Sequence, residues 1–442
     1  MSLSSDQDLL CDLTMSIELL EDFEKCAHQR TPQHEEPLST SRAGRVIIAG
    51  AGIGGLFLAI LLERIGIPYL LLERAPRVKP LGSALALGPN ILPVFEQLGL
   101  TSLLASISLP CPILNIYDPS LKKMGSFKMK KQTELTGYEG LICSRPNLYE
   151  LLLSQIQPHN LILGKKILSY EENEFGVSVC CSDNTVYSGD ILVGADGAYS
   201  RVRKNMFKKL RKRGLISKTQ QTESPVPCSV CWLGVAKSQD PEKYECLKEP
   251  FVNYSTVVGG NGLGWNVINI PDDEICWIFW KQLDISKVSE ERYFQNAEWA
   301  SSNDDGIMQW FQEAPCPYGG AMGDLIKATP PGLISKVYLQ EQIFDTWHHG
   351  RCVLIGDACH IMLPGAGQGA MSAMQDAVVL ANCLFEMKEL TTPIISAAFQ
   401  EYQSQRFRHA RTQFVKSRLM TKLLAGQSLI QRSQFQSSSL LD

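Results

Sequence analysis

The chain has 442 residues, of which 44% are hydrophobic and 20% are charged. This length and composition fit a globular protein of two or three domains with a large core. The formal net charge of −4 provides no general attraction to nucleic acid or to an anionic membrane, so neither is expected as a partner.

The N-terminus carries no recognisable targeting signal. It is polar and acidic, unlike a secretory signal or a mitochondrial transit peptide. The 14 cysteines are scattered along the chain, which favours free thiols in a reducing compartment over a disulfide scaffold. No apolar run of 18 residues makes a credible membrane span. We therefore expect a cytoplasmic protein without a transmembrane segment.

Residues 1–43 read as an N-terminal extension that is partly disordered. Residues 9–23 carry a helical apolar pattern, and residues 28–42 are rich in Pro, Ser, Thr and charge, as linkers are.

A glycine-rich loop follows the first strand. The β-branched run Val46–Ile48 predicts a buried strand, and the apolar run 56–62 continues as a helix. Between them Gly50, Gly52 and Gly55 have the G-x-G-x-x-G spacing, with Gly54 as a fourth glycine. The first glycine permits a tight turn, the second lets backbone approach a pyrophosphate, and the third lets helix and strand pack closely.

A second strand, Tyr69–Leu72, ends at Glu73, with Arg74 beside it. An acid about 20 residues after the glycine loop is typical of a dinucleotide site, where it binds a ribose hydroxyl. It favours FAD or NAD over NADP, and it leaves these two open.

From about residue 225 to 285, strand-like runs recur at short spacing and predict an antiparallel sheet: 229–235, 251–258, 265–270 and 275–280. Alternation along the last strand places Cys276, Ile278 and Trp280 on one face and Trp277 and Phe279 on the other. The sequence does not indicate which face lines a substrate pocket.

Two further motifs place an acid at the end of an apolar strand. They are Asp196-Gly197, before a helix start, and Gly356-Asp357, before a glycine-rich helix start at Gly369-Ala370. A carboxylate beside a helix N-terminus suits a polyhydroxy chain next to a phosphate, because the acid accepts from hydroxyls and backbone N–H groups meet negative charge.

With these three motifs in this order, the chain resembles the group A FAD-dependent aromatic hydroxylases and epoxidases, with a fold similar to p-hydroxybenzoate hydroxylase. The segment 356–380 most resembles the fungal monooxygenases of secondary metabolism in this family. The fold class expected is α/β: a discontinuous Rossmann-like FAD-binding domain, an inserted antiparallel-sheet substrate domain and C-terminal helices. The expected ranges are 44–224 and 341–390 for the FAD-binding domain, 225–340 mainly for the substrate domain and 391–442 for the helical region.

The resemblance implies roles for individual residues. Glu73 would hold the AMP ribose, Asp357 would bond the ribityl and pyrophosphate region, and Asp196-Gly197 would serve FAD and the nicotinamide donor. Ala86 and Arg145 would lie along the cofactor, with Gly369 and Ala370 at the flavin end. Met371 departs from the asparagine common in the family, which puts one polar contact near the flavin in doubt.

The implied activity is a monooxygenase reaction. NADPH or NADH would reduce FAD, O₂ would form a flavin C4a-hydroperoxide, and one oxygen atom would pass to an aromatic or olefinic small molecule. A flavin oxidase, reductase or halogenase of the same fold is the first alternative, and a non-catalytic carrier of prenylated proteins is the second. No catalytic side chain and no metal cluster is assigned, and His360 is not expected to be a base. The basic run 203–213 is expected to be a solvated helix face.

Overall fold

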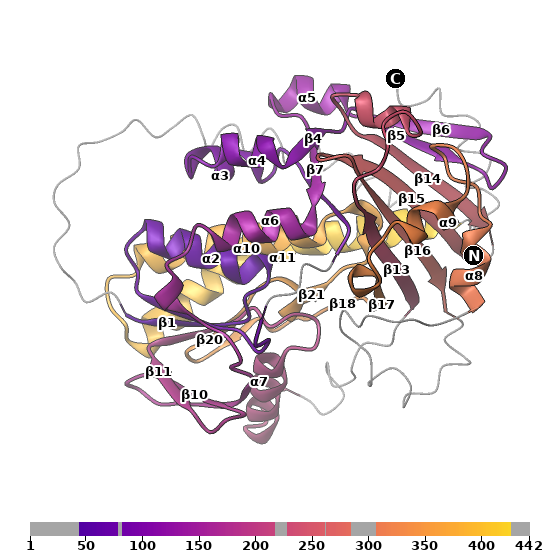
Figure 1. Ribbon diagram of the computed structural model, residues 1–442. Helices are drawn as coiled ribbons and strands as arrows, with labels where there is room; N and C mark the ends of the chain where they lie inside the picture. Colours follow the sequence, from indigo (N-terminus) through magenta and orange to yellow (C-terminus); the bar gives the residue numbers. More distant parts are fainter. Residues whose placement is uncertain (1–43, 78–81, 217–227, 261, 284–305, 426–442) are drawn as a thin grey trace, which may run out of the picture. The chain divides into compact units, whose positions relative to one another are not determined.

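The computed structural model describes residues 44–77, 82–216, 228–260, 262–283 and 306–425, which all belong to one unit, residues 43–442 (Figure 1). The expected N-terminal extension, including its helical pattern, lies outside the described residues.

The first sheet is six-stranded and mostly parallel. Its order is β19-β20-β12-β1-β2-β8, and only the edge strand β19 runs antiparallel to its neighbour. The four central strands are almost wholly buried, as expected for a parallel sheet covered on both faces. The strands are β1 (Val46–Ala49), β2 (Tyr69–Leu72), β8 (Leu161–Ile162), β12 (Ile191–Gly194), β19 (His348–His349) and β20 (Cys352–Leu354).

Chain order and spatial order differ in this sheet. Strand β20 comes near the end of the chain, yet it pairs with β12, which in turn pairs with β1. The three strands that carry the glycine loop, the D-G motif and the G-D motif are therefore neighbours. This arrangement confirms the discontinuous, Rossmann-like α/β fold.

The second large sheet has seven strands in the order β17-β13-β16-β15-β14-β5-β6. All neighbours are antiparallel except β14 and β5, which are parallel. The strands are β5 (Ile113–Tyr117), β6 (Lys123–Lys128), β13 (Ser229–Ala236), β14 (Asn253–Gly260), β15 (Leu263–Ile270), β16 (Glu274–Gln282) and β17 (Ser335–Leu339).

Two of these strands, β5 and β6, fall inside the range 44–224 expected for the first FAD-binding segment. The basic stretch after β5 forms β6 and then helix α5 (Lys130–Thr136). Strand β6 is a half-exposed edge strand whose terminal lysines face solvent.

The two faces of the seven-stranded sheet have different neighbours. On one face Trp265, Trp277 and Phe279 pack with Phe311 of helix α8 (Gly306–Gln312) and with helix α9 (Met322–Lys327). On the other face, Cys276 packs near Ala86, and Trp280 packs near Leu424 of the last helix. We call this second face the inner face. It is the face that packs against β3 and the last helix, whereas α8 and α9 cover the opposite face.

Helices and smaller sheets complete the described part of the fold. The helices that matter for the site are α2 (Ile53–Arg64), α6 (Arg145–Leu153), α7 (Arg201–Lys212), α10 (Gly369–Glu386) and α11 (Thr392–Leu424). Two short ones are α3 (Leu92–Gln97) and α4 (Thr101–Ser106). The smaller sheets are β3 (Ala84–Leu87) with β7 (Leu141–Ser144) and β4 (Ser108–Pro110); β9 (Ile167–Glu172), β10 (Val177–Cys181) and β11 (Val186–Gly189); and β18 (Gln342–Ile343) with β21 (His360–Ile361). No helix in the described ranges is long and apolar enough to cross a membrane.

Candidate active site

The glycine loop joins β1 to α2, and each glycine meets a different constraint. Gly50 has φ +101°, a conformation that side chains with a Cβ rarely adopt. A Cβ on Gly55 would lie 2.0 Å from the carbonyl oxygen of Gly50, so helix and loop touch there. A Cβ on Gly52 would meet nothing within 4 Å. Open space thus lies in front of Gly52, at the N-terminal end of α2, where backbone N–H groups attract an anion.

Glu73, at the end of β2, is hydrogen-bonded to this loop. Its two carboxylate oxygens accept from the backbone N–H groups of Ala51 (2.9 Å) and Ala75 (2.8 Å). Each oxygen can accept a further hydrogen bond, so the carboxylate can hold the loop and still bind a hydroxyl. Arg74 beside it is exposed.

Asp196 of the D-G motif is bonded within its own motif. One carboxylate oxygen accepts from the Ser200 hydroxyl (2.5 Å), and the other accepts from the backbone N–H groups of Arg201 (2.7 Å) and Val202 (3.1 Å). Desolvation raises the pKa of Asp196, while these bonds act in the opposite direction. Its immediate role is to cap helix α7. Next to it, Gly197 has open space where a Cβ would stand.

Arg203 links the D-G motif to the G-D motif, a role that the sequence interpretation missed. Its guanidinium donates to the carbonyl oxygens of Ala358 (2.8 Å) and Ala198 (2.7 Å), and it lies 4.2 Å from the ring centroid of Phe344. Desolvation lowers its pKa to about 10. The expectation of a solvated face was wrong for this residue, which is 3% exposed.

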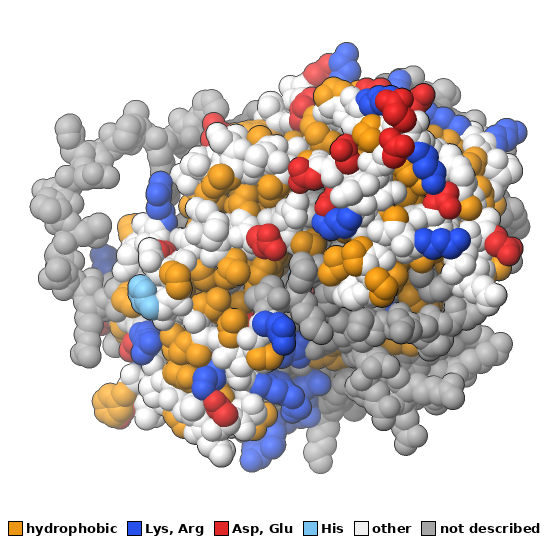
Figure 2. Space-filling model, in the orientation of Figure 1, with side chains coloured by type: hydrophobic (Ala, Val, Ile, Leu, Met, Phe, Trp, Pro, Cys, Tyr) orange, Lys and Arg blue, Asp and Glu red, His pale blue; other side chains and the backbone are white. Residues whose placement is uncertain are grey.

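Lys204, Lys208, Lys212 and Arg213 of the basic run are exposed as expected, whereas Lys209 and Arg211 are half-buried. Figure 2 shows Lys and Arg side chains gathered over α7, and Arg201, Lys204, Lys208 and Lys212 are exposed there. The buried face of α7 carries Val202, Met206, Phe207 and Leu210, and the same helical period includes position 203. That periodicity was the available signal for Arg203.

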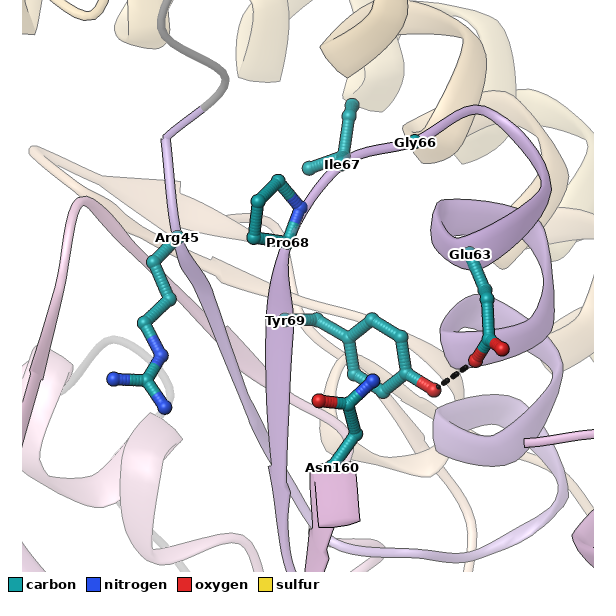
Figure 3. A pocket seen from close by; sticks show the side chains of 7 residues that line it. All are labelled: Arg45, Glu63, Gly66, Ile67, Pro68, Tyr69 and Asn160. Carbon is teal, nitrogen blue, oxygen red and sulfur yellow. Dashed lines mark hydrogen bonds between the residues drawn. The ribbon is translucent and has the colours of Figure 1, made fainter. Parts of the chain in front are cut away.

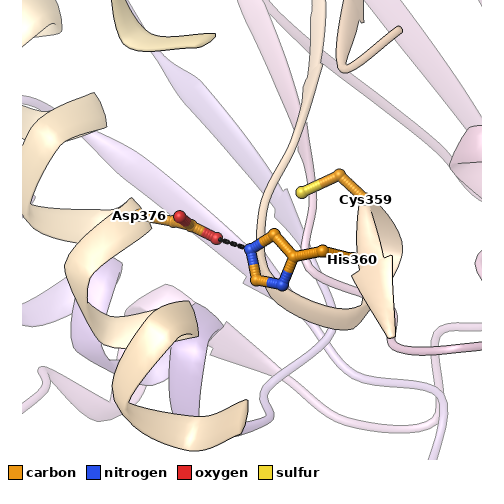
Figure 4. Close-up of side chains that lie close together, drawn as sticks. All are labelled: Cys359, His360 and Asp376. Carbon is orange, nitrogen blue, oxygen red and sulfur yellow. Dashed lines mark hydrogen bonds and ion pairs between the residues drawn. The ribbon is translucent and has the colours of Figure 1, made fainter. Parts of the chain in front are cut away.

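The G-D loop is fixed from behind by Asp376 of helix α10. The backbone N–H of Gly356 donates to Asp376 Oδ2 (2.9 Å), and His360 Nε2 lies 2.6 Å from the same oxygen (Figure 4). Arg406 of α11 donates from Nε to Asp376 Oδ1 (2.8 Å). Desolvation opposes the charged carboxylate, but attraction to His360 and Arg406 outweighs it and holds the pKa of Asp376 below its usual value.

Within the described residues, Cys359, His360 and Asp376 place possible metal-ligand atoms within 4.8 Å of one another (Figure 4). Both oxygens of Asp376 already bind, and one of them binds a guanidinium that would repel a cation. Burial raises the pKa of the Cys359 thiol well above its ordinary value, so the thiolate form is disfavoured. The group is therefore better described as a structural hydrogen-bond network. Because His360 is fully buried within it, it is inaccessible to a substrate.

Asp357 faces a concave part of the protein surface, which we infer from two properties of its side chain and call the recess. Its side chain is exposed to solvent, yet desolvation raises its pKa even though nearby cations, Arg203 and Arg145 among them, favour the charged form. A carboxyl that solvent reaches but that protein surrounds must face a concave space. Arg145, at the start of α6, is half-buried, and desolvation lowers its pKa in the same surroundings.

The entrance to α10 borders this recess. A Cβ on Gly367 would lie 3.5 Å from the Cβ of Ala86 on β3, while a Cβ on Gly369 would meet nothing within 4 Å. Met371, one turn into the helix, is buried, and its sulfur lies 3.1 Å from the backbone N of Gly88. Ala86 therefore lies beside the loop that enters α10, and Met371 supports the backbone after β3.

A separate pocket of about 450 Å³ lies at the amino ends of β1, β2 and β8 (Figure 3). It is lined by Arg45, Glu63, Gly66, Ile67, Pro68, Tyr69 and Asn160. Arg45 and Pro68 precede β1 and β2, whereas the glycine loop follows β1. Ligands of open α/β sheets bind at the carboxyl ends of the strands, so this pocket is not the dinucleotide site.

Comparison with known proteins agrees with the three motifs. The family model described as "FAD binding domain" matches residues 44–220 and 289–415. The FAD-dependent monooxygenase ausM of Penicillium brasilianum is 30% identical over 400 residues, covering 87% of this chain and 80% of that protein. The chain belongs to the FAD-dependent monooxygenases.

Two more similarities fit this family. The FAD-dependent monooxygenase ptmM of Penicillium ochrochloron is 29% identical over 394 residues, covering 86% of this chain and 89% of the relative. The crystal structure of Klebsiella pneumoniae HpxO complexed with FAD and uric acid matches with TM-score 0.71 and 24% identity, over 91% of this chain and 95% of that one. The expected flavoprotein oxidoreductase is thus confirmed at the level of family and fold.

Proposed function

We propose that this FAD-dependent monooxygenase consumes NADPH or NADH and inserts one oxygen atom from O₂ into an aromatic or olefinic small molecule, by hydroxylation or epoxidation. A place in secondary metabolism is consistent with its fungal relatives. The observation that carries the proposal is that the G-D loop presents an exposed, desolvated Asp357, while Ala86 lies both beside the entrance to α10 and against the apolar inner face.

The residues around the recess fit FAD. The open space at Gly52 and the N-terminus of α2 suit the pyrophosphate, and Glu73 suits the AMP ribose. Asp357 is a free acceptor for ribityl hydroxyls, and the open position at Gly369 suits a flat ring. The full set that we assign to the cofactor is Gly50, Gly52, Gly54, Gly55, Glu73, Arg74, Ala86, Arg145, Asp196, Gly197, Gly356, Asp357, Gly369 and Ala370.

Bound FAD would supply the redox chemistry, accepting hydride from the nicotinamide donor and activating O₂. The protein holds the cofactor and keeps water from the reacting atoms. Arg203 joins the D-G loop to the G-D loop, and Asp376 joins the G-D loop to α10, so Asp357 is presented at a fixed place. The inner face is apolar, and Ile278, which is partly exposed on it, provides a surface against which a substrate can lie.

We also propose a cytoplasmic location. The 12 cysteines among the described residues are all free, which favours a reducing compartment.

Purified full-length protein tests the proposal. We expect a yellow protein with FAD absorbance that oxidises NADPH or NADH only when O₂ is present. With a library of phenols and alkenes, at least one compound should gain the mass of one oxygen atom. A colourless protein that does not take up FAD would refute the proposal. A yellow protein that never modifies a compound would favour an oxidase or reductase.

A further inference from the structure

Tyr254, Thr256 and Asn266 are polar side chains that lie close together on the inner face of the seven-stranded sheet. Thr256 pairs with Asn266 across β14 and β15, and Asn266 pairs with Ile278 across β15 and β16. Side chains of directly paired residues point to the same face, so Thr256 and Asn266 lie on the inner face. Tyr254, two residues before Thr256, shares that face. Around them are apolar side chains, among them Leu233, Val235, Val258, Ile268 and Cys276.

Tyr254 and Asn266 are hydrogen-bonded to each other, and both side chains can form further hydrogen bonds. Asn266 Nδ2 donates to the Tyr254 hydroxyl oxygen at 2.9 Å. The phenolic oxygen is then an acceptor, and we find no acceptor for its own proton among the described residues. Asn266 Oδ1 and Thr256 Oγ1 are also buried without a partner within the described ranges. Unpaired polar atoms are costly in an apolar environment, so such a cluster indicates a missing partner.

Tyr254 also lies near Ala86, which we assign to the cofactor site. It packs in one cluster with Ala84 and Ala86 of β3. Ala86 in turn meets Gly367, at the entrance to α10. Tyr254 is partly exposed, although desolvation raises its pKa far enough to keep the phenol protonated. This combination of exposure and desolvation is the one found at Asp357, so both side chains face a concave space.

We infer that Tyr254 donates its phenolic hydrogen to an oxygen atom of the substrate, and that Asn266 is a positioning residue that sets the direction of that hydrogen. The substrate class is then an apolar molecule that carries a hydroxyl or carbonyl oxygen. A pure hydrocarbon would leave the phenolic hydrogen unpaired. This inference rests on the proposed function, because it assumes that the substrate lies between the inner face and the flavin.

The test uses the FAD-loaded full chain and two probes of similar size, 2-naphthol and 2-methylnaphthalene. Equilibrium dialysis gives the dissociation constant of each. We expect the wild type to bind 2-naphthol about tenfold more tightly or better, since one hydrogen bond to a buried group is worth roughly that factor. Tyr254→Phe should weaken 2-naphthol binding by about that factor and leave 2-methylnaphthalene unchanged.

Two further variants separate this role from a general effect on folding. Tyr244→Phe makes the same chemical change in a tyrosine buried on the opposite face of the sheet, and it should leave both dissociation constants unchanged. Asn266→Leu should reduce the preference for 2-naphthol, and it should have no further effect when combined with Tyr254→Phe. That non-additivity is expected only if Asn266 acts through Tyr254.

A wild type without preference for 2-naphthol, whether it binds both probes or neither, overturns the inference. So does a Tyr254→Phe variant that keeps the preference with full FAD occupancy. Failure of the proposed function would give a different result, because the wild type itself would then lack FAD or O₂-dependent NAD(P)H oxidation.

Discussion

The backbone N–H of Gly356 donates to Asp376 Oδ2 over 2.9 Å, and this bond joins the G-D loop to helix α10. Arg406 holds the other oxygen of the same carboxylate from α11. The last two long helices thus act directly on the loop that presents Asp357. A buried ion pair thus supports the loop that carries the proposed cofactor ligand.

Removing the charge of Asp376 should destabilise the protein. In Asp376→Asn, the guanidinium of Arg406 stays buried without its counter-ion, which costs about 3–5 kcal/mol. Unfolding in urea measures the change. Glu341→Gln is the matched control. Glu341 pairs near the surface with Arg418, which lies on α11 like Arg406, and the loss of this pair should cost at most about 1 kcal/mol. Equal effects of the two substitutions would contradict the importance given to the buried pair.

The same ion pair should shape stability in acid. The pKa of Asp376 is lowered in the folded state, so its stabilising contribution is present above the unfolded pKa of about 3.9 and disappears as pH falls through the folded value. Wild-type protein should therefore lose stability below about pH 4 more steeply than Asp376→Asn. Denaturation midpoints from pH 3 to pH 7 test this, and parallel curves for the two proteins would count against it.

Two glycines of the same loop should respond oppositely to alanine. Gly52→Ala adds a methyl group to open space at an allowed backbone conformation, so stability should stay the same or rise by up to about 1 kcal/mol. The methyl would occupy the approach of the pyrophosphate, and FAD affinity should fall by about tenfold or more. Gly55→Ala, which meets the carbonyl oxygen of Gly50, should cost at least about 2 kcal/mol. Fluorescence titration with FAD and urea unfolding separate the outcomes. Full FAD affinity in a stable Gly52→Ala protein would exclude this loop as the phosphate site.

Asp357→Ala should weaken FAD binding without lowering the stability of the apoprotein. Desolvation raises the pKa of Asp357 in the folded, FAD-free protein, so the carboxylate costs stability once pH rises above the unfolded value of about 3.9. The variant without FAD should be at least as stable as wild-type apoprotein at pH 7, and this advantage should vanish near pH 4. Its ratio of flavin to protein absorbance after purification should show largely apoprotein. Full flavin occupancy would remove Asp357 from the cofactor site.

Arg203→Met should weaken the link between the two motifs. The loss of its buried hydrogen bonds should cost about 2–3 kcal/mol, because the carbonyl oxygens of Ala198 and Ala358 lose their charged donor. Lys208→Met, on the exposed face of the same helix, should change stability by less than about 0.5 kcal/mol. Thermal unfolding of the two variants gives the comparison, and a stable Arg203→Met would show that the D-G and G-D motifs hold together without it.

Much of this architecture was predictable because local patterns specify it. The strand, glycine loop and helix at 46–64, and the two strands that end in acids, are each encoded within a few residues. The pairing of β5 with β14 was not predictable, because it joins segments far apart in the chain and depends on tertiary packing. The choice of inner face was unpredictable for the same reason. Alternation defines two faces, and only the packing of α8 and α9 decides which one is covered.

Among the residues that support the site, some could be predicted from local sequence and others could not. Arg203 could have been found from its place on the apolar face of α7. Arg406 could not, because an arginine within a long helix rich in charged residues gives no local sign that it is buried against Asp376. Sequence thus indicates the residues that face the recess better than those that hold them in place.

Isotope labelling of the product tests the central proposal most directly. The FAD-loaded enzyme, NADPH or NADH, and a compound found to react would be incubated under ¹⁸O₂ and analysed by mass spectrometry. Monooxygenation predicts that the product carries one ¹⁸O atom under ¹⁸O₂ and none when the label is in water. A product that takes its oxygen from water, or that forms without O₂, would contradict it.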